Sequence, residues 1–380
     1  MRKLPFEKSS SSQPAMKVFA AVARSSEQPF VIEECELVRP SAHEVRVKVH
    51  ACGICHTDSA ARLQHLPVSF PQTLGHEGAG VVEEVGREVT SLANGDHVIM
   101  TFGSCGRCEC CASAKPAYCD DFLAINIAGK REGGAPLRQN GQPIGQHFFS
   151  QAAFSTHAIA NPRNLVKVDA SLPLEFLAPL GCGIQTGMGT VLNVLKPALG
   201  TAIAVFGVGA VGMAAIIAAK IVGCGPIIAV DLVQERLEAA RSFGATHVID
   251  GRSADVALQI RSITGKGAHF SIDTTGHPPV IAEATNCLRK LGVGAHLAAP
   301  PRGTQYCIPS HVLSGAGLTW RGVVEGDSDI QTFIPEMIRY YRAGQLPLDR
   351  MVTTYPLASI NQAIADSESG KVLKAVLVMP

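Results

Sequence analysis

A glycine-rich turn between an apolar strand and an apolar helix constrains the fold of this chain the most. A buried-type strand over residues 201–206 precedes the turn, and a segment with helical spacing, residues 211–222, follows it. The turn carries a G-x-G-x-x-G pattern with glycines at Gly207, Gly209 and Gly212. In this context the first glycine forms the turn, the second lets a pyrophosphate approach the backbone, and the third lets the helix pack on the strand. The segment therefore predicts a dinucleotide-binding unit.

Strands and helices alternate beyond this turn. A second buried-type strand spans residues 226–230, and the helix-like segment VQERLEAARSFG follows it. Further strand-like runs are THVID, FSIDTTG and GAHLAAP. Alternating strands and helices predict a parallel sheet covered by helices on both faces. We therefore expect an α/β protein whose residues 184–324 form a Rossmann-type, doubly wound cofactor domain.

An acidic residue ends the second strand. Asp231 lies nineteen residues after Gly212, where a carboxylate accepts hydrogen bonds from the ribose hydroxyls of NAD and repels the additional phosphate of NADP. The alternative for Asp231 is a solvated loop acid. Arg236 is a nearby cation that would soften the repulsion. The pattern favours NAD, bound by the three glycines and Asp231 with Arg236 close by.

The cysteines are clustered. Seven of the twelve lie within residues 52–119, which indicates metal binding rather than a disulfide framework. A C-x2-C-x2-C-x7-C pattern is formed by Cys105, Cys108, Cys111 and Cys119. Four thiolates on one short loop can surround a zinc ion and leave no open position. The pattern predicts a structural zinc site with Cys110 outside the ligand set, and free cysteines on a glycine-rich loop are the alternative.

A second candidate metal site is distributed over three segments. Cys55 lies in GICHTD, His76 in GHE and Cys182 in LGCG. One imidazole and two thiolates leave the fourth position of a zinc ion free for water or substrate. Each residue alone has an ordinary alternative, a structural histidine or a small buried cysteine, and Cys52 with Cys55 also forms a C-x2-C pair typical of redox sites. Together the three favour a catalytic zinc site.

The rest of the chain is typical of a β-rich domain with long loops. Strand-like runs occur at residues 17–21 and 45–49, and the chain ends in a strand-like KAVLVMP. We expect residues 16–183 and 325–380 to form one catalytic domain. Residues 1–15 have no apolar core of the kind that a signal peptide needs, and we expect a flexible tail there.

Charge and hydropathy restrict the partners. The chain has 33 basic and 32 acidic residues, a net charge of +1, and its apolar runs are broken by charges or glycines before they reach the length of a membrane span. We therefore expect neither nucleic acid nor a membrane as a partner. Clustered, reduced cysteines without a secretion signal favour a cytoplasmic location.

These motifs resemble those of the zinc-containing medium-chain alcohol dehydrogenases. The likeness extends over residues 16–380 and rests on GICHTD, GHEGAGVVEEVG, the four-cysteine segment, LGCGIQTGMG and FGVGAVG. GHEGAG, HFFSQAAF and LGCGIQTG are most similar to the aryl- or benzyl-alcohol dehydrogenases and the allylic, geraniol-type enzymes. The resemblance implies a GroES-like catalytic domain beside the Rossmann domain, and a homodimer or homotetramer. It also implies NAD-linked interconversion of a primary aromatic or allylic alcohol and its aldehyde.

The resemblance assigns roles at the catalytic zinc. It implies one zinc ion held by Cys55, His76 and Cys182, and a second held by the four-cysteine segment. Thr57 matches the hydroxyl that carries the substrate proton. Asp58 matches an acid behind the histidine ligand His76, and Glu77 matches an acid beside the metal.

Further roles concern cofactor and substrate. His56 and Lys374 match basic residues near the cofactor pyrophosphate. Three phenylalanines match the wall of an apolar substrate pocket, although each is equally well explained as a core aromatic: Phe102, Phe148 and Phe149. Ala60 departs from the liver-type enzymes, which have a histidine there that ends the proton relay, so the route of proton exit stays open between His56, His65 and water.

Two other functions remain as alternatives. A glutathione-dependent formaldehyde dehydrogenase shares the CHTD run and the chain length, but it needs cationic residues to hold the carboxylates of glutathione. A non-enzymatic structural paralogue would keep the fold, but drift of that kind is expected to remove catalytic ligands, and all three are present here.

Overall fold

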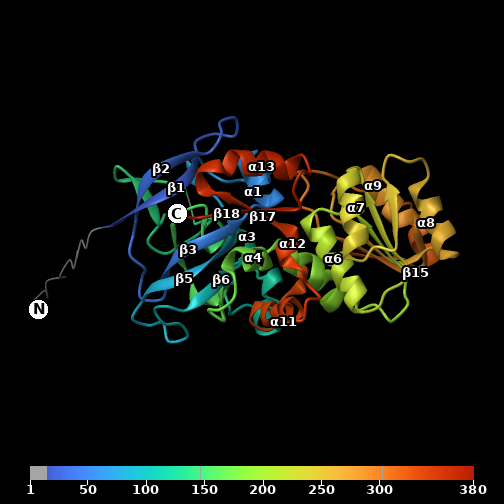
Figure 1. The fold of residues 1–380 in the computed structure, drawn as a ribbon, viewed down its shortest axis with the longest axis horizontal. Helices are drawn as coiled ribbons and strands as arrows, with labels where there is room; N and C mark the ends of the chain where they lie inside the picture. Colours follow the sequence, from blue (N-terminus) through green and yellow to red (C-terminus); the bar gives the residue numbers. More distant parts are fainter. Residues whose placement is uncertain (1–14, 146, 302) are drawn as a thin grey trace, which may run out of the picture.

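The strands of the described chain form three β-sheets. The structure is a computed structural model that describes residues 15–145, 147–301 and 303–380, so the predicted tail lies outside the described residues except for Ala15. Figure 1 shows an elongated arrangement, with strands β1, β3 and β5 at one end and helices α6 to α9 with strand β15 at the other.

Two of the sheets form the β-rich part. In the first, β1 (Met16–Ala23) pairs antiparallel with β2 (Val31–Leu37). In the second, β3 (Val45–Gly53) pairs with β5 (Glu77–Val85), and Val45, Val47 and Val49 are buried while the residues between them are more exposed, as expected for a strand with one face on the core. The other strands of these sheets are β4 (Gln72–Thr73), β6 (His97–Met100), β7 (Leu137–Gln139), β8 (Gln142–Pro143), β9 (His157–Ala160), β10 (Leu165–Val168), β17 (Val352–Pro356) and β18 (Lys374–Val378).

Helices and short turns cover these sheets and connect them. The last strand, β18, pairs antiparallel with β3, so the end of the chain returns to the first domain, beside the segment that carries Cys55. The helices outside the third sheet are α1 (His56–Arg62), α2 (Glu109–Ala112), α3 (Phe122–Asn126), α4 (Leu174–Leu177), α11 (Ile330–Arg342), α12 (Leu348–Met351) and α13 (Ile360–Glu368). Short 3-10 turns are η1 (Pro116–Tyr118), η2 (Phe148–Ser150), η3 (Pro162–Asn164), η4 (Ala178–Gly181), η6 (Glu325–Asp327) and η7 (Leu357–Ser359).

The third sheet is parallel throughout, in the order β13-β12-β11-β14-β15-β16. Alternate residues of its central strand face opposite sides: Ile203 and Val205 belong to one apolar core, and Ala204 and Phe206 to another. Each face therefore needs its own cover of helices, and the predicted doubly wound α/β fold is confirmed. The elements are β11 (Ile203–Phe206), α6 (Ala210–Ile221), β12 (Ile227–Asp231), α7 (Gln234–Phe243), β13 (His247–Asp250), α8 (Val256–Thr264), β14 (Ala268–Asp273), α9 (Pro278–Asn286), β15 (Leu288–His296), α10 (Ser310–Ala316) and β16 (Thr319–Gly322).

Helix α5 (Gly183–Gly189) connects the two domains and continues into the π-helical turn η5 (Thr190–Leu195). A Cβ atom on Gly187 would lie 2.0 Å from the carbonyl oxygen of Val211 in α6. Only glycine permits this close approach of the two helices, which holds the segment after Cys182 against the first helix of the cofactor domain.

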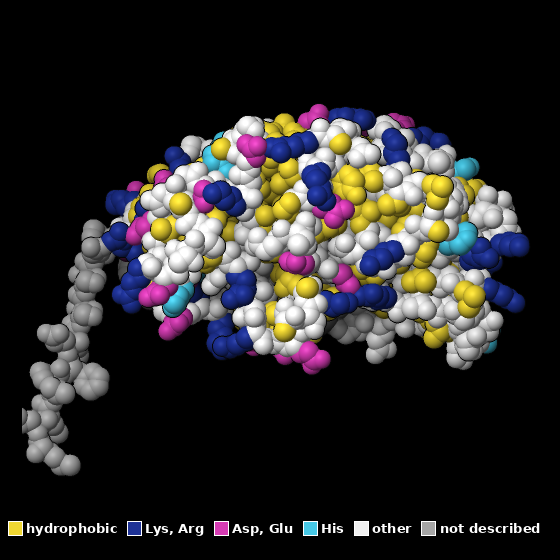
Figure 2. All heavy atoms as spheres, turned by 90° about the horizontal axis from the view of Figure 1, so that it is seen from below, with side chains coloured by type: hydrophobic (Ala, Val, Ile, Leu, Met, Phe, Trp, Pro, Cys, Tyr) yellow, Lys and Arg dark blue, Asp and Glu magenta, His cyan; other side chains and the backbone are white. Residues whose placement is uncertain are grey.

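The surface mixes charges of both signs. On the face drawn in Figure 2, basic and acidic side chains are interspersed, and hydrophobic side chains gather over the middle and right of the molecule. Among the helices of the described residues, none has the length and apolar character needed to cross a membrane.

Candidate active site

The junction of β3 and α1 carries the first candidate ligand. Cys55 is the N-cap residue of α1, and its backbone N–H donates a hydrogen bond to Asp58 Oδ2 (3.0 Å). The N–H of Ile54 donates to the carbonyl oxygen of Ala375 in β18 (2.9 Å). The first turn of α1 is thus closed by a carboxylate and held to the last strand of the chain, which fixes the position of Cys55.

The same carboxylate orients His76. Asp58 Oδ1 accepts hydrogen bonds from Nδ1 of His76 (2.9 Å) and from the N–H of Gly75 (3.0 Å). A carboxylate at Nδ1 places the proton on that nitrogen and leaves the lone pair of Nε2 free to bind a metal ion. His76 is fully buried, and its Nε2 has no hydrogen-bond partner among the described residues. A buried, unpaired nitrogen of this kind is what a metal ligand requires.

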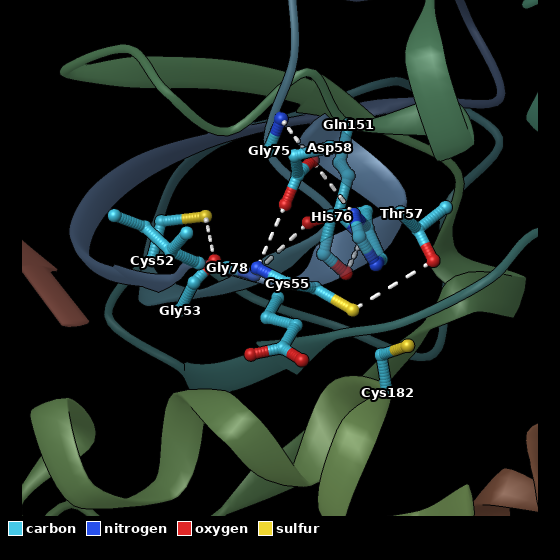
Figure 3. A network of polar contacts seen from close by, with 12 residues as sticks. Cys52, Gly53, Cys55, Thr57, Asp58, Gly75, His76, Gly78, Gln151 and Cys182 are labelled. Carbon is cyan, nitrogen blue, oxygen red and sulfur yellow. Dashed lines mark hydrogen bonds and ion pairs between the residues drawn. The ribbon is translucent and has the colours of Figure 1, made fainter. Parts of the chain in front are cut away.

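Cys182, the N-cap residue of α5, is the third candidate ligand, and we call Cys55, His76 and Cys182 the metal trio. Atoms of Cys55, His76, Cys182 and Glu77 that can bind a metal all lie within 4.8 Å of one another. The ligand atoms of a tetrahedral zinc ion are about 3.5–3.8 Å apart, given Zn–S and Zn–N distances of about 2.3 and 2.0 Å. Figure 3 shows the sulfur atoms of Cys55 and Cys182, the His76 ring and the Thr57 hydroxyl around one space, while the sulfur of Cys52 lies apart from it, against the carbonyl oxygen of Gly53. The donor set therefore fits zinc.

A buried ion pair borders this space. Lys374 Nζ lies 2.7 and 2.6 Å from the two carboxylate oxygens of Glu77 and 2.8 Å from the carbonyl oxygen of Ile54. Burial raises the pKa of Glu77 to about 7, and the ammonium group of Lys374 acts in the opposite direction. Because Lys374 is already paired, its role at the cofactor pyrophosphate stays a prediction.

A cluster of aromatic rings packs against the ring of His76. The ring centre of Phe149 lies 4.5 Å from that of His76, and the ring centre of Phe148 lies 5.8 Å from it. Phe102 joins them through Phe122, which sequence analysis did not single out. The structure thus brings the three predicted phenylalanines together as one buried wall beside the histidine.

Gln151 anchors this wall, and sequence analysis missed it. Its Oε1 accepts a hydrogen bond from the N–H of Gly78 (3.0 Å), and its Nε2 donates to the carbonyl oxygens of His76 (2.9 Å) and Thr101 (3.1 Å). The backbone of Phe149 is left-handed (φ +49°), a conformation that costs on the order of 1–3 kcal/mol and persists only where the surroundings impose it. The one available signal was a polar residue inside the apolar run HFFSQAAF.

A second carboxylate, also missed, contacts the metal trio. Glu325 Oε1 lies 3.6 Å from Cys182 Sγ, and Glu325 Oε2 accepts a hydrogen bond from Gln185 Nε2 (3.1 Å). Burial raises the pKa of Glu325 to about 7. Its signal in the sequence was an acidic residue directly after a strand-like segment of the cofactor domain.

The four-cysteine segment forms a separate cluster. One sulfur from each residue lies within 4.8 Å of the others, in Cys105, Cys108, Cys111 and Cys119. The backbone N–H groups of Cys108 and Cys105 donate to Cys105 Sγ (3.4 Å) and Cys119 Sγ (3.2 Å), contacts that stabilise thiolates. Cys110 is not a member of this cluster. The geometry fits a zinc ion with no open position.

The glycine turn after β11 combines two close backbone contacts with one open position. Gly207 is left-handed (φ +81°), and a Cβ atom there would lie 2.4 Å from Thr274 Oγ1. A Cβ atom on Gly212 would lie 2.0 Å from the carbonyl oxygen of Gly207, whereas one on Gly209 would meet no described atom within 4 Å. Gly209 is also the N-cap residue of α6. The three glycines therefore have the backbone geometry expected of a turn that binds a pyrophosphate.

The other residues expected around the cofactor ribose and phosphates lie on β12, α7 and α1. Asp231 Oδ2 and Oδ1 accept hydrogen bonds from the N–H groups of Val208 (2.7 Å) and Val233 (2.9 Å), which leaves lone pairs free for ribose hydroxyls. Arg236 donates to the carbonyl oxygen of Ser367 (3.3 Å), at the end of α13. His56 is exposed at the start of α1, and Ala60 is buried one turn later.

Two family descriptions match the sequence. Residues 210–339 match the zinc-binding dehydrogenases, and residues 41–170 match the alcohol dehydrogenase GroES-like domain. The chain is also 39% identical to a geraniol dehydrogenase of Castellaniella defragrans, over 97% of this chain and 99% of that protein.

Two solved structures are similar over almost the whole chain. An alcohol dehydrogenase zinc-binding domain protein from Burkholderia ambifaria superposes with a TM-score of 0.94 at 47% identity, covering 96% of this chain and 100% of that one. A benzyl alcohol dehydrogenase from Acinetobacter calcoaceticus gives a TM-score of 0.92 at 40% identity, with the same coverage of 96% and 100%.

Proposed function

Because the chain belongs to the zinc-containing medium-chain alcohol dehydrogenases, we propose that it interconverts a primary aromatic or allylic alcohol and its aldehyde with NAD. The aromatic wall against His76 is the observation that carries this proposal, since it offers an apolar surface beside the site where the metal would bind. The names of the geraniol and benzyl alcohol dehydrogenases among its relatives support the same substrate class.

The side chains of the site have distinct tasks in this reaction. Cys55, His76 and Cys182 would hold a zinc ion, which would supply the Lewis acid that makes the hydroxyl of an alcohol more acidic. The hydroxyl oxygen of Thr57, 3.7 Å from Cys55 Sγ, accepts a hydrogen bond from the alcohol and orients it. Asp58 keeps the proton of His76 on Nδ1 throughout.

The cofactor side is arranged for hydride transfer to a bound nicotinamide, which supplies the electron acceptor. The turn at Gly207 and Gly209 and the N-terminus of α6 would hold the pyrophosphate, and the carboxylate of Asp231 would bind the ribose and disfavour an additional phosphate. These contacts fix the distance and orientation of the nicotinamide relative to the substrate.

A kinetic panel tests the substrate class. With NAD, kcat/KM for benzyl alcohol and geraniol should exceed that for ethanol by at least about tenfold, because burying an aromatic or allylic group against apolar walls contributes roughly 1.5–3 kcal/mol. NADP should give a lower kcat/KM than NAD with the same alcohols. The measurement is the initial rate of absorbance change at the wavelength of the reduced nicotinamide.

Matched variants show whether the wall causes the preference. Phe149→Leu should lower the ratio of kcat/KM for benzyl alcohol to that for ethanol, whereas Phe243→Leu, at a buried site in α7, should leave this ratio unchanged. A higher kcat/KM for ethanol or a polyol would contradict the proposal. Turnover of S-hydroxymethylglutathione above all alcohols would favour the formaldehyde dehydrogenase, and a zinc-loaded protein inactive on the whole panel would favour a non-enzymatic paralogue.

A further inference from the structure

A short turn with left-handed backbone torsion angles contacts the side chain of Cys182. The three residues of η6, Glu325, Gly326 and Asp327, have φ angles of +48°, +64° and +52°. Left-handed backbone is unfavourable for residues other than glycine and persists where surrounding contacts impose it. Two of the three residues carry carboxylates. That of Glu325 contacts Cys182 and Gln185, and that of Asp327 contacts Arg321.

The first carboxylate, on Glu325, connects the thiol of Cys182 with the amide of Gln185. Glu325 is 7% exposed, and its two oxygens lie 3.6 Å from Cys182 Sγ and 3.1 Å from Gln185 Nε2. Gln185 Nε2 also donates to the carbonyl oxygen of Gly181 (2.7 Å), the residue before Cys182. Backbone and side chain of the candidate ligand are therefore held by one small network.

Close backbone packing holds the turn in place. A Cβ atom on Gly326 would lie 2.3 Å from the carbonyl oxygen of Gln185, and one on Gly189 would lie 2.4 Å from the carbonyl oxygen of Gly326. That second oxygen also accepts a hydrogen bond from Asn193 Nδ2 (3.0 Å). The turn is thus packed closely against α5 and η5, the segments that follow Cys182.

The second carboxylate reaches the four-cysteine segment. Asp327 accepts hydrogen bonds from the hydroxyl of Tyr118 and from the guanidinium group of Arg321. Tyr118 directly precedes Cys119 in the chain, and its hydroxyl oxygen also accepts a hydrogen bond from the N–H of Val324 (3.4 Å). A continuous set of contacts therefore runs from Cys119 through the turn to Cys182.

We propose that Glu325 is a positioning residue for Cys182, and that the turn Glu325–Asp327 connects the catalytic metal trio to the four-cysteine segment through Tyr118. The carboxylate of Glu325 holds the amide of Gln185, which binds the carbonyl oxygen before Cys182 and so fixes the backbone that carries the ligand, and Asp327 holds Glu325 in place by anchoring the turn. This inference rests on the proposed function to the extent that the trio holds the catalytic metal.

Cobalt provides a readout independent of turnover. Protein with Co²⁺ in the trio and Zn²⁺ in the four-cysteine segment should show absorption bands that depend on the geometry of the two thiolates. In Glu325→Ala these bands should shift, and loss of cobalt to a chelator should be about 10- to 100-fold faster, the usual effect of losing a residue that supports a ligand. Glu325→Gln keeps a hydrogen-bonding group and should restore both values toward those of the unmodified protein.

Two more variants complete the test. Tyr118→Phe removes one hydroxyl and should accelerate cobalt release to a smaller extent in the same direction, whereas Glu132→Ala, at an exposed position, should change neither value. Unchanged bands and release in Glu325→Ala would overturn the positioning role, and unchanged release in Tyr118→Phe would overturn the connection. If the trio bound no metal, both this inference and the proposed function would fail; if cobalt bound but no alcohol were oxidised, only the proposed function would.

Discussion

Replacing Cys182 by alanine should lower the zinc content from about two ions to about one per chain and reduce oxidation of benzyl alcohol about a thousandfold. Cys55 and His76 then remain as only two of the three predicted ligands, because the carboxylate of Glu77 is paired with Lys374, and two are too few to retain the ion against solvent and chelators. Without the ion the alcohol loses several kcal/mol of charge stabilisation in the transition state. Metal analysis by plasma emission and initial rates with NAD measure both effects on one preparation.

A buried cysteine elsewhere is the matched control. Cys35, 1% exposed in β2, is also buried but lies outside both cysteine clusters. Cys35→Ala should retain both zinc ions and the activity of the unmodified protein. A Cys182→Ala protein that kept its full zinc content and its rate would contradict the assignment of this residue as a ligand.

Cys105→Ser should lower the free energy of unfolding by about 4 kcal/mol or more, because loss of a metal is one of the few mechanisms by which a single substitution has so large an effect. The four-cysteine segment has little apolar material of its own, since helix α2 within it buries none of its residues. Metal coordination is therefore the main interaction that orders this segment. Urea denaturation followed by fluorescence or circular dichroism measures the change.

Cys110 offers a control one residue away from a predicted ligand. It lies outside the cluster of sulfur atoms, so Cys110→Ser should change the free energy of unfolding by no more than about 0.5 kcal/mol. Equal losses of stability in Cys105→Ser and Cys110→Ser would show that the segment tolerates no cysteine substitution for reasons unrelated to metal. No loss in Cys105→Ser would contradict a structural metal there.

The α/β fold could be predicted because its signals are local. The two strands next to the glycine turn, IAVF and IIAVD, are short apolar runs, and the glycine pattern at Gly207 marks the strand–helix turn without reference to the rest of the chain. The four-cysteine cluster is equally local, since its spacing alone brings the sulfur atoms close. The catalytic trio is more distributed, and it was identified from residue types together with the family resemblance.

Contacts between distant segments could not be predicted. Glu325 and Cys182 are 143 residues apart, and Lys374 and Glu77 are 297 apart, so no spacing rule indicates that they meet. Gln151 was hidden for another reason: its three hydrogen bonds go to backbone groups, which every residue carries and which leave no mark in the sequence. The ammonium group of Lys374 is paired with Glu77 and Ile54, a contact that the sequence did not indicate, and the role at the cofactor that the resemblance assigns to Lys374 stays a prediction.

Anomalous diffraction from crystals of the zinc-loaded protein with NAD and an alcohol, recorded on both sides of the zinc absorption edge, tests the catalytic site most directly. We predict a peak about 2.3 Å from the sulfur atoms of Cys55 and Cys182 and about 2.0 Å from Nε2 of His76, with an oxygen of the alcohol or of water in the fourth position. The absence of a peak among these three atoms, or a fourth protein side chain that remains bound there, would contradict the account.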